Sequence, residues 1–216
     1  AGIYSCKIKG LCDSTVTSFA HLTVNQLVSI THQPDGDARC MGDMAIFIVK
    51  ASNENASYQW QKDGIDLPGS TSSLLTIDDL QLSDSGIYQC IVKDSCNTVY
   101  SNTAALTVNK RTEIISQPVS DTVCDGQSSG FTVNAQGSSL SFQWLRDGQP
   151  ISNGSIYSGT TSATLHITDA TISEAGVYQC KVSGICDDTL RTAPAILKVN
   201  TLTAINQHPV EQQVCL

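Results

Sequence analysis

The sequence has no long apolar run and few basic residues. No stretch approaches the roughly 20 apolar residues that cross a bilayer, and the first residues show neither the charged nor the apolar segment of a secretory signal. We therefore expect no membrane insertion in this segment, and we expect any export signal or anchor to lie outside it. The net charge is -8 and no lysine or arginine cluster stands out, so a phosphate backbone would be repelled and we expect no nucleic-acid partner.

Signatures of catalysis and metal binding are also missing. The nine cysteines include no C-x-x-C pair, and the four histidines have no metal-ligand spacing. One hydrolase-type motif, G-x-S-x-G at residues 126–130, lacks the strand-to-helix turn that a nucleophilic Ser128 needs. We therefore expect no enzyme activity, no cofactor and no metal site. So many cysteines instead indicate disulfides and an oxidising, extracellular or cell-surface location.

What the sequence does contain favours strands. It is 40% hydrophobic and 15% charged, with many Ser, Thr, Gly and Asn residues, which suits strands and polar turns better than helices. Apolar and polar residues alternate, for example around Phe131, Val133 and Ala135, with the period of a half-buried strand. The fold class is therefore predicted to be all-β, and 216 residues are enough for two ordinary domains.

A comparison of the chain with itself reveals a repeat. The segment SYQWQKDG returns as SFQWLRDG, and SDSGIYQC returns as SEAGVYQC, while the chain opens on the related AGIYSC. Two copies are complete, and we interpret the two ends of the chain as cuts through domains of a longer array. The expected divisions are the end of one repeat at 1–25, whole repeats at 26–109 and 110–200, and the start of another at 201–216.

The repeat resembles immunoglobulin-like domains over the whole chain. Trp60 and Trp144 occupy the place of the core tryptophan, and a Lys/Arg-Asp-Gly turn follows each of them. Asp/Glu-x-Gly-x-Tyr-x-Cys resembles the tyrosine corner, with Tyr two residues before Cys. The resemblance implies tandem β-sandwiches of seven or eight strands. The expected core markers are Trp60, Trp144, Tyr4, Tyr88 and Tyr178.

One feature departs from that family. The position that usually carries the first core cysteine falls at about Val133, and each repeat has three cysteines elsewhere. This set of three resembles tandem repeats of large Bacteroidetes surface and secreted proteins, which implies a bacterial exterior. The disulfide candidates are the leading cysteines (Cys40, Cys124 and Cys215), the central cysteines (Cys6, Cys90 and Cys180) and the trailing cysteines (Cys12, Cys96 and Cys186).

Three cysteines cannot all pair inside one repeat, and sequence alone leaves their connectivity open. One alternative joins leading and central cysteines within a domain, such as Cys124 with Cys180, and closes a loop of about 50 residues worth roughly 4 kcal/mol. The other joins Cys40 to Cys186 in the next domain, because the turn at the bottom of one sandwich would meet the turn at the top of the next. Cys180 would then be a buried apolar thiol.

Two further features are candidates for modification or binding. Asp-Ser/Thr-x triplets at Ser14, Thr122 and Thr189 resemble the pattern at which Bacteroidetes attach O-glycans to exported proteins. The second complete repeat has a longer stretch at residues 151–164, in which Tyr157 is the natural aromatic anchor for a ligand.

The sequence favours a structural or adhesive protein, in which tandem sandwiches form a rod or filament. We expect about five residues between successive strands at 108 and 114, and an unbroken strand at 98–108, so each repeat should add length with little free hinging. The expected partners are other copies of the chain or neighbouring repeats in a fibre. The alternatives are a module that binds glycans or cell-surface proteins, and spacer repeats of a secreted multidomain enzyme.

Overall fold

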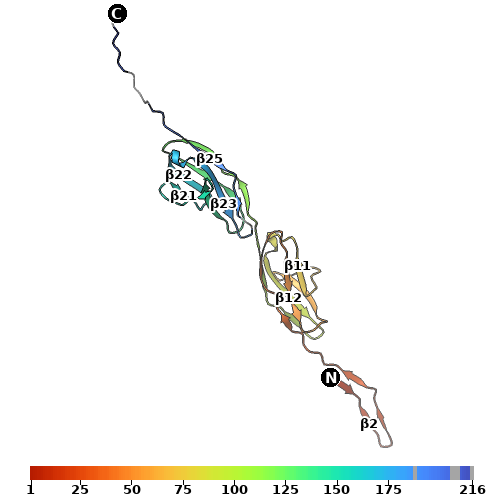
Figure 1. The fold of residues 1–216 in the computed structure, drawn as a ribbon. Helices are drawn as coiled ribbons and strands as arrows, with labels where there is room; N and C mark the ends of the chain where they lie inside the picture. The colour runs from red at the N-terminus through yellow and green to blue at the C-terminus, as the bar shows by residue number, and fades with distance from the viewer. Residues whose placement is uncertain (187–188, 205–209, 215–216) are drawn as a thin grey trace. The chain divides into compact units, whose positions relative to one another are not determined.

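The computed structural model describes residues 1–186, 189–204 and 210–214, which fold into short strands and two short 3-10 helices (Figure 1). Contacts divide the chain into two units, Ala1–Thr107 and Val108–Leu216. The predicted all-β fold class is confirmed. In the described part of the chain, no helix is long and apolar enough to cross a membrane.

Two nested antiparallel pairs precede the first sandwich. β1 pairs with β4 and β2 pairs with β3. Tyr4 is 57% exposed, because the described residues of these hairpins supply no second sheet to cover it, and its role as a core marker stays a prediction. The strands are β1 (Gly2–Tyr4), β2 (Lys7–Lys9), β3 (Ser14–Val16) and β4 (Ala20–Leu22).

The first sandwich consists of two layers. One layer has the order β10-β9-β12-β14-β6, with β13 also paired to β12, and the other holds the pairs β5–β8 and β11–β7. Its elements are β5 (Ile30–His32), β6 (Asp37–Cys40), β7 (Ala45–Ile48), β8 (Lys50–Ala51), β9 (Ser57–Lys62), β10 (Ile65–Asp66), β11 (Leu74–Ile77), η1 (Leu82–Asp84), β12 (Gly86–Lys93), β13 (Thr98–Tyr100) and β14 (Ala104–Asn109).

The second sandwich repeats this topology. One layer has the order β16-β25-β23-β19-β20, with β24 paired to β23, and the other holds β15–β18 and β17-β22-β21. Figure 1 labels β21, β22, β23 and β25 of this sandwich. Its elements are β15 (Glu113–Ser116), β16 (Asp121–Cys124), β17 (Gln127–Thr132), β18 (Asn134–Gln136), β19 (Ser141–Arg146), β20 (Gln149–Pro150), β21 (Tyr157–Ser158), β22 (Thr164–Ala170), η2 (Ile172–Glu174), β23 (Gly176–Ser183), β24 (Leu190–Arg191) and β25 (Ala195–Asn200).

The two ends of the chain differ in what can be described. Residues 201–204 and 210–214 contain no strand, and the rest of the expected start of a further repeat, including Cys215, lies outside the described residues.

The expected unbroken strand at 98–108 is wrong, because β13 and β14 are separate. Ser101 between them is buried, and its hydroxyl accepts a hydrogen bond from the Cys90 N–H at 2.9 Å. Thr192 does the same for Cys180 in the second sandwich.

Each sandwich is filled around one tryptophan. Trp144 is fully buried, its indole N–H donates to the Ser162 carbonyl at 2.9 Å, and its ring lies 6.2 Å from that of Phe131. Phe131 stacks in turn on Tyr178, with ring centroids 4.9 Å apart. The first sandwich repeats the arrangement with Trp60, Ser72, Phe47 and Tyr88. Aromatic pairs at these separations contribute beyond the apolar area they bury.

The repeated tyrosine motif forms a corner in both units. The Tyr88 hydroxyl donates to the Asp84 carbonyl at 2.8 Å, and the Tyr178 hydroxyl donates to the Glu174 carbonyl at 2.7 Å. Burial raises the pKa of Tyr88 to about 12, so its hydroxyl stays protonated and remains a donor. The bond ties the end of each 3-10 helix to the strand that follows it.

The Asp-Gly turn explains why glycine stands two residues before each of these tyrosines. Asp147 and Gly148 both have positive φ (49° and 81°), as a two-residue hairpin turn requires. The Asp147 carboxylate accepts the Val177 N–H at 2.9 Å. A Cβ at Gly176 would lie 2.8 Å from that carboxylate, so only glycine leaves room for the contact.

Candidate functional site

The leading cysteines lie in the same local structure in both sandwiches. Cys40 ends β6 and Cys124 ends β16. The Cys40 N–H donates to Asp43 Oδ2 at 3.1 Å, and the Cys124 N–H donates to Gln127 Oε1 at 2.9 Å. The glycine two residues after each has a φ of 82° or 83°, a conformation that glycine adopts without strain.

The cysteines differ in their bonding. Cys40 and Cys186 are disulfide-bonded, and Cys215 lies outside the described residues. The predicted alternative that joins Cys124 to Cys180 within a domain is wrong, because both of these cysteines are free. The free cysteines are the buried Cys90 and Cys180 and the exposed Cys6, Cys12, Cys96 and Cys124.

The central cysteines behave as apolar core side chains. Cys180 is fully buried in the cluster that contains Val133 and Trp144, and its Sγ contacts the Lys181 carbonyl at 3.4 Å. Burial raises the pKa of both Cys90 and Cys180 to about 11, so the thiols are neutral at ordinary pH and unreactive as nucleophiles. Each occupies the place of a family disulfide without forming one.

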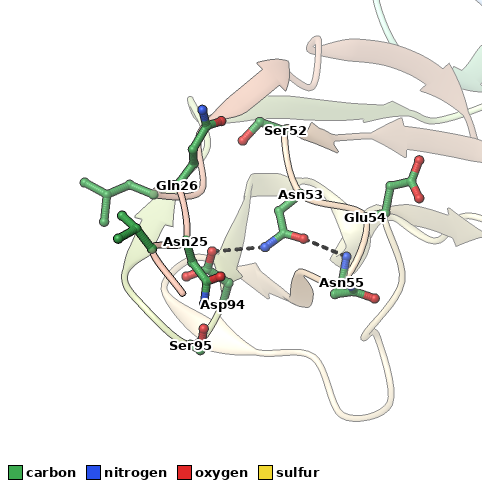
Figure 2. Close-up of a pocket in the computed structure, with 10 residues that line it drawn as sticks. Asn25, Gln26, Ser52, Asn53, Glu54, Asn55, Asp94 and Ser95 are labelled. Atoms are coloured by element: carbon green, nitrogen blue, oxygen red, sulfur yellow. Dashed lines mark hydrogen bonds between the residues drawn. The ribbon is translucent and has the colours of Figure 1, made fainter. Parts of the chain in front are cut away.

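A polar groove lies at the loop end of the first sandwich (Figure 2). Asn53 donates to Asp94 Oδ2 at 3.1 Å, and its Oδ1 accepts the Asn55 N–H at 3.0 Å. The backbone N–H groups of Asn97 and Cys96, which bond to the Asp94 carboxylate, lower its pKa. The loop-end groove measures about 650 Å³ and is lined by Val24, Asn25, Gln26, Leu27, Ser52, Asn53, Glu54, Asn55, Asp94 and Ser95. Its amide and carboxylate groups suit a polar ligand, and the motif search missed it because its residues are far apart in sequence.

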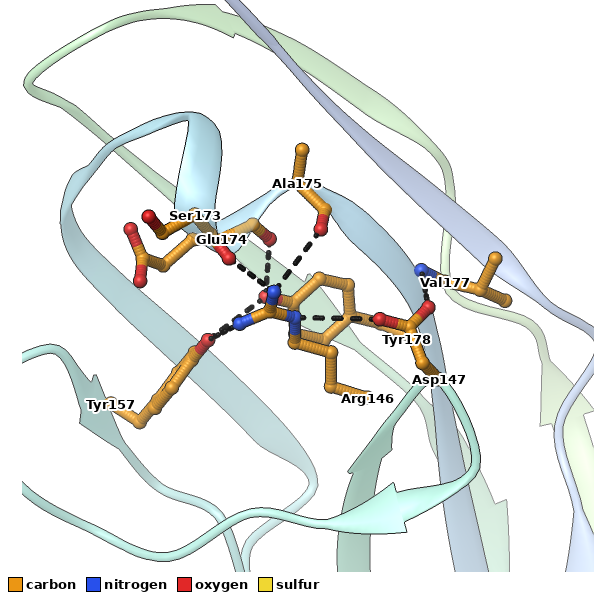
Figure 3. A network of polar contacts seen from close by, with 8 residues as sticks. All are labelled: Arg146, Asp147, Tyr157, Ser173, Glu174, Ala175, Val177 and Tyr178. Atoms are coloured by element: carbon orange, nitrogen blue, oxygen red, sulfur yellow. Dashed lines mark hydrogen bonds and ion pairs between the residues drawn. The ribbon is translucent and has the colours of Figure 1, made fainter.

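Tyr157, the predicted ligand anchor, folds back onto its own sandwich (Figure 3). Its hydroxyl lies 3.2 Å from the Tyr178 hydroxyl and accepts from Arg146 Nη1 at 3.1 Å. Arg146 also donates to the Ser173 carbonyl and lies 3.6 Å from Asp147 Oδ2. Lys62 makes the same contact to the Ser83 carbonyl in the first sandwich. The extra stretch therefore ties to the tyrosine corner through Tyr157.

We expect Tyr157→Phe to lower the unfolding free energy of the second sandwich by about 1 kcal/mol, because it removes the two hydrogen bonds of the hydroxyl. Urea denaturation followed by hydrogen exchange of peptides from residues 108–200 would measure the change. Tyr100→Phe is the matched control, since the Tyr100 side chain is 60% exposed. Equal stability of Tyr157→Phe and the unaltered chain would mean that the hydroxyl makes no structural contact and is free for a ligand.

The possible O-glycosylation residues are exposed. Ser14 lies in β3, Thr122 in β16, and the Thr189 hydroxyl lies 2.8 Å from the Ser183 hydroxyl. Their glycosylation stays a prediction. Within residues 1–186, 189–204 and 210–214, no three His, Cys, Asp or Glu side chains come together as a possible metal site.

The chain is similar to animal proteins with repeated domains of this kind. It is 27% identical over 225 residues to human "Leucine-rich repeats and immunoglobulin-like domains protein 3", which covers 90% of this chain and 20% of that protein. The chain therefore spans about a fifth of that curated relative. These animal relatives give no support to the bacterial origin that the three-cysteine pattern suggested.

Solved structures share the fold. A three-domain titin fragment, I67–I69, matches with a TM-score of 0.76 at 17% identity, over 94% of this chain and 75% of that chain. The insect immune protein hemolin, described with implications for homophilic adhesion, matches with a TM-score of 0.58 at 17% identity, over 92% of this chain and 56% of that chain.

A family model decides the classification. The model of the immunoglobulin domain matches residues 29–94 and 112–184, one match in each unit. These matches include both buried tryptophans and both tyrosine corners. The chain belongs to the immunoglobulin domain family.

Proposed function

We propose that this chain is a structural and adhesive segment of an extracellular protein, in which immunoglobulin domains in series form a rod or filament. The observation that carries the proposal is the connection between the two sandwiches. β14 ends at Asn109 and β15 begins at Glu113, so only three residues connect them. So short a connection supports a stiff junction rather than a flexible linker.

Those three residues are themselves tied to the second unit. The Lys110 N–H donates to Ser138 Oγ at 2.9 Å, and the Lys110 carbonyl accepts the Ser138 N–H at 3.0 Å. Lys110 Nζ also donates to Gln136 Oε1, and Thr112 is only 9% exposed. The backbone of the connection therefore has little conformational freedom of its own, which supports a structural role.

The start of the first sandwich is held in a similar way. Val28 is 2% exposed, its N–H donates to Asn97 Oδ1 at 2.8 Å, and its carbonyl accepts from Asn97 Nδ2 at 3.1 Å. Val28 stands two residues before Ile30, as Thr112 stands two residues before Ile114. Both sandwiches thus bury the residue through which the chain enters them.

We further propose that Cys40 and Cys186 are bonded to each other and staple successive domains. The two are the disulfide-bonded cysteines among the described residues, whereas the six others described there are free. A leading cysteine of one domain would then join a trailing cysteine of the next, and the covalent bond would limit bending at the junction.

We expect Cys40→Ser to broaden the distribution of distances between spin labels placed one on each sandwich, because the junction loses its covalent restraint. Cys124→Ser is the matched control, since it changes the equivalent leading cysteine, which is free, and should leave the distribution unchanged. Peptide mapping without reduction should recover Cys40 linked to Cys186. A chain that keeps its narrow distribution in Cys40→Ser, or that yields no such linked peptide, would contradict the staple.

The adhesive part of the proposal concerns copies of the chain or cell-surface proteins as partners. It draws support from hemolin, whose structure is described with implications for homophilic adhesion. The loop-end groove supports a second candidate, a module that binds a glycan. A glycan array probed with the chain and with Asn53→Ala would test it, and signals that are equal for both would exclude the groove as the binding site.

A further inference from the structure

The second sandwich has a strand that the first sandwich lacks. β21 pairs antiparallel with β22, whereas β11, the counterpart of β22, pairs with β7 alone within residues 26–109, all of which the structure describes. Leu67 and Ser70 bond to the backbone of the first core tryptophan, and two residues separate them. Ile151 and Thr160 make the same bonds in the second sandwich, but eight residues separate them. The shorter stretch leaves β11 with an open outer edge.

The open edge of β11 carries backbone groups whose counterparts are bonded in the second sandwich. The Val49 N–H donates to the Ser73 carbonyl at 2.9 Å. By the alternation of an antiparallel pair, the N–H groups of Thr76 and Asp78 therefore point away from β7. Thr168, which corresponds to Asp78, donates its N–H at 2.8 Å to the carbonyl that precedes β21. An edge of this kind is a template for an added strand.

Tyr157 in β21 covers the core of the second sandwich from this edge (Figure 3). It lies opposite Ile167, which is fully buried. The counterpart of Ile167 in the first sandwich is Ile77, which is only partly buried. An aromatic side chain on an added strand would cover Ile77 in the same way. The residues that correspond to Arg146 and Tyr178, the contacts of the Tyr157 hydroxyl, are Lys62 and Tyr88.

The outer face of β7 and β11 is apolar in the first sandwich and polar in the second. Ile48 lies opposite Leu74, and their side chains are 41% and 47% exposed. Their counterparts are Thr132 and Thr164, whose hydroxyls lie 3.1 Å apart. Ile46 is exposed beside them, and we call Ile46, Ile48 and Leu74 the apolar outer face. Exposed apolar side chains next to an open strand edge are typical of a surface that another chain covers.

We propose that the outer edge of β11 binds an extended, tyrosine-bearing segment of a different protein, which adds a strand to this sheet as β21 does in the second sandwich. The backbone groups of Thr76 and Asp78 bond to the segment, and its tyrosine lies against Ile77. Its outward side chains continue the apolar outer face. The inference rests on the proposed function only in that a protein partner exists, because all of these residues lie in the first sandwich.

The charge at the end of β11 favours a basic partner. Asp78 and Asp79 are both exposed, where the second sandwich has Thr168 and Asp169. In the register of β21, the residues before Tyr157 lie beside this end of the strand. A lysine or arginine in that part of the segment is complementary to the two carboxylates. A second copy of this chain is a poor partner, because its net charge is -8 and its own β21 is already paired with β22.

The test uses the full chain and a fluorescent synthetic peptide with the sequence of residues 152–161, in which Asn153 and Gly154 are replaced by lysine. Fluorescence anisotropy should show saturable binding with a dissociation constant below about 1 mM. The bound peptide should also slow hydrogen exchange at the amides of Thr76 and Asp78, because the added strand accepts these two donors.

One variant of the peptide and two of the chain serve as controls. The peptide with Tyr157→Ala should bind about tenfold more weakly, because it lacks the ring that covers Ile77. Thr76→Pro removes one donor of the outer edge and leaves the bonds to β7 in place, so it should also weaken binding about tenfold. A graft in which residues 151–160 replace residues 67–70 supplies the first sandwich with a strand of its own, and it should bind no peptide.

Binding that is equal in Thr76→Pro and the unaltered chain, or that survives the graft, would place the peptide elsewhere and overturn the inference. Absence of saturable binding up to the stated limit would overturn it as well. Self-association of the chain that Thr76→Pro abolishes would assign the edge to a second copy and exclude a different protein. The distances between spin labels on the two sandwiches are measured separately, so a failure of the proposed rod is distinguished from a failure of the peptide site.

Discussion

Trp144→Ala should lower the unfolding free energy of the second sandwich by about 4 kcal/mol, the cost typical of removing a buried tryptophan. The side chain is fully buried, it fills the space beside Phe131, and its loss also leaves the Ser162 carbonyl without its indole donor. Because domains are commonly stable by only 5–15 kcal/mol, much of the stability of this sandwich would be lost. Cys180 lies opposite Trp144 where β23 pairs with β19, so it would face the cavity left by the substitution.

Hydrogen exchange measured peptide by peptide during urea unfolding would separate the two sandwiches. Trp144→Ala should shift the transition of peptides from 113–200 and leave peptides from 30–107 in place. Trp60→Ala is the matched control and should do the reverse, because Trp60 has the same burial and donates the same bond to Ser72. A shift of both sandwiches by either variant would show that the two unfold as one unit.

Val133→Cys should restore the disulfide that the family usually has and stabilise the oxidised second sandwich. Val133 and Cys180 lie in the same buried cluster, and a bond between them would close a loop of about 50 residues, worth about 4 kcal/mol in the chain-entropy estimate. In the reduced state, the loss of the valine methyl groups should instead cost about 1 kcal/mol. The sign of the effect should therefore reverse with the redox state.

Urea midpoints with and without reducing agent would measure both effects. Val133→Cys combined with Cys180→Ala is the control that cannot form the bond, and it should show no gain on oxidation. Val49→Cys offers the matched test in the first sandwich, since Val49 is fully buried and stands in the same place relative to Gly42. If mapping finds the new cysteine bonded to Cys124 instead of Cys180, the assignment of this core position is wrong.

The sequence predicted the parts of the fold that depend on short spacings. The tyrosine corner joins residues four apart, and the Asp-Gly turn is built from adjacent residues, so a motif contains nearly all of the geometry. Longer-range contacts show the limit of this approach. Gln33 and Gln117 each precede a proline in the sequence, but that pattern does not reveal that their side chains accept the N–H groups of Asn102 and Ala193.

Features that join distant segments could not be predicted in the same way. The hydrogen bond from the Val28 N–H to Asn97 joins residues 69 positions apart, and no local sequence pattern marks it. The exposure of Tyr4 followed from what surrounds its hairpin and not from its motif. Cysteine pairing has the same dependence, because which thiols meet is decided only when all the strands are in place.

The unpaired central cysteines decide whether the two sandwich cores depend on oxidation. With no covalent bond between Cys90 or Cys180 and another residue, each core is held by packing alone and needs no oxidant to form. Burial also removes these thiols from disulfide exchange with other cysteines. Among the described residues, cross-linking therefore concerns cysteines outside the two cores, and the cores themselves do not depend on it.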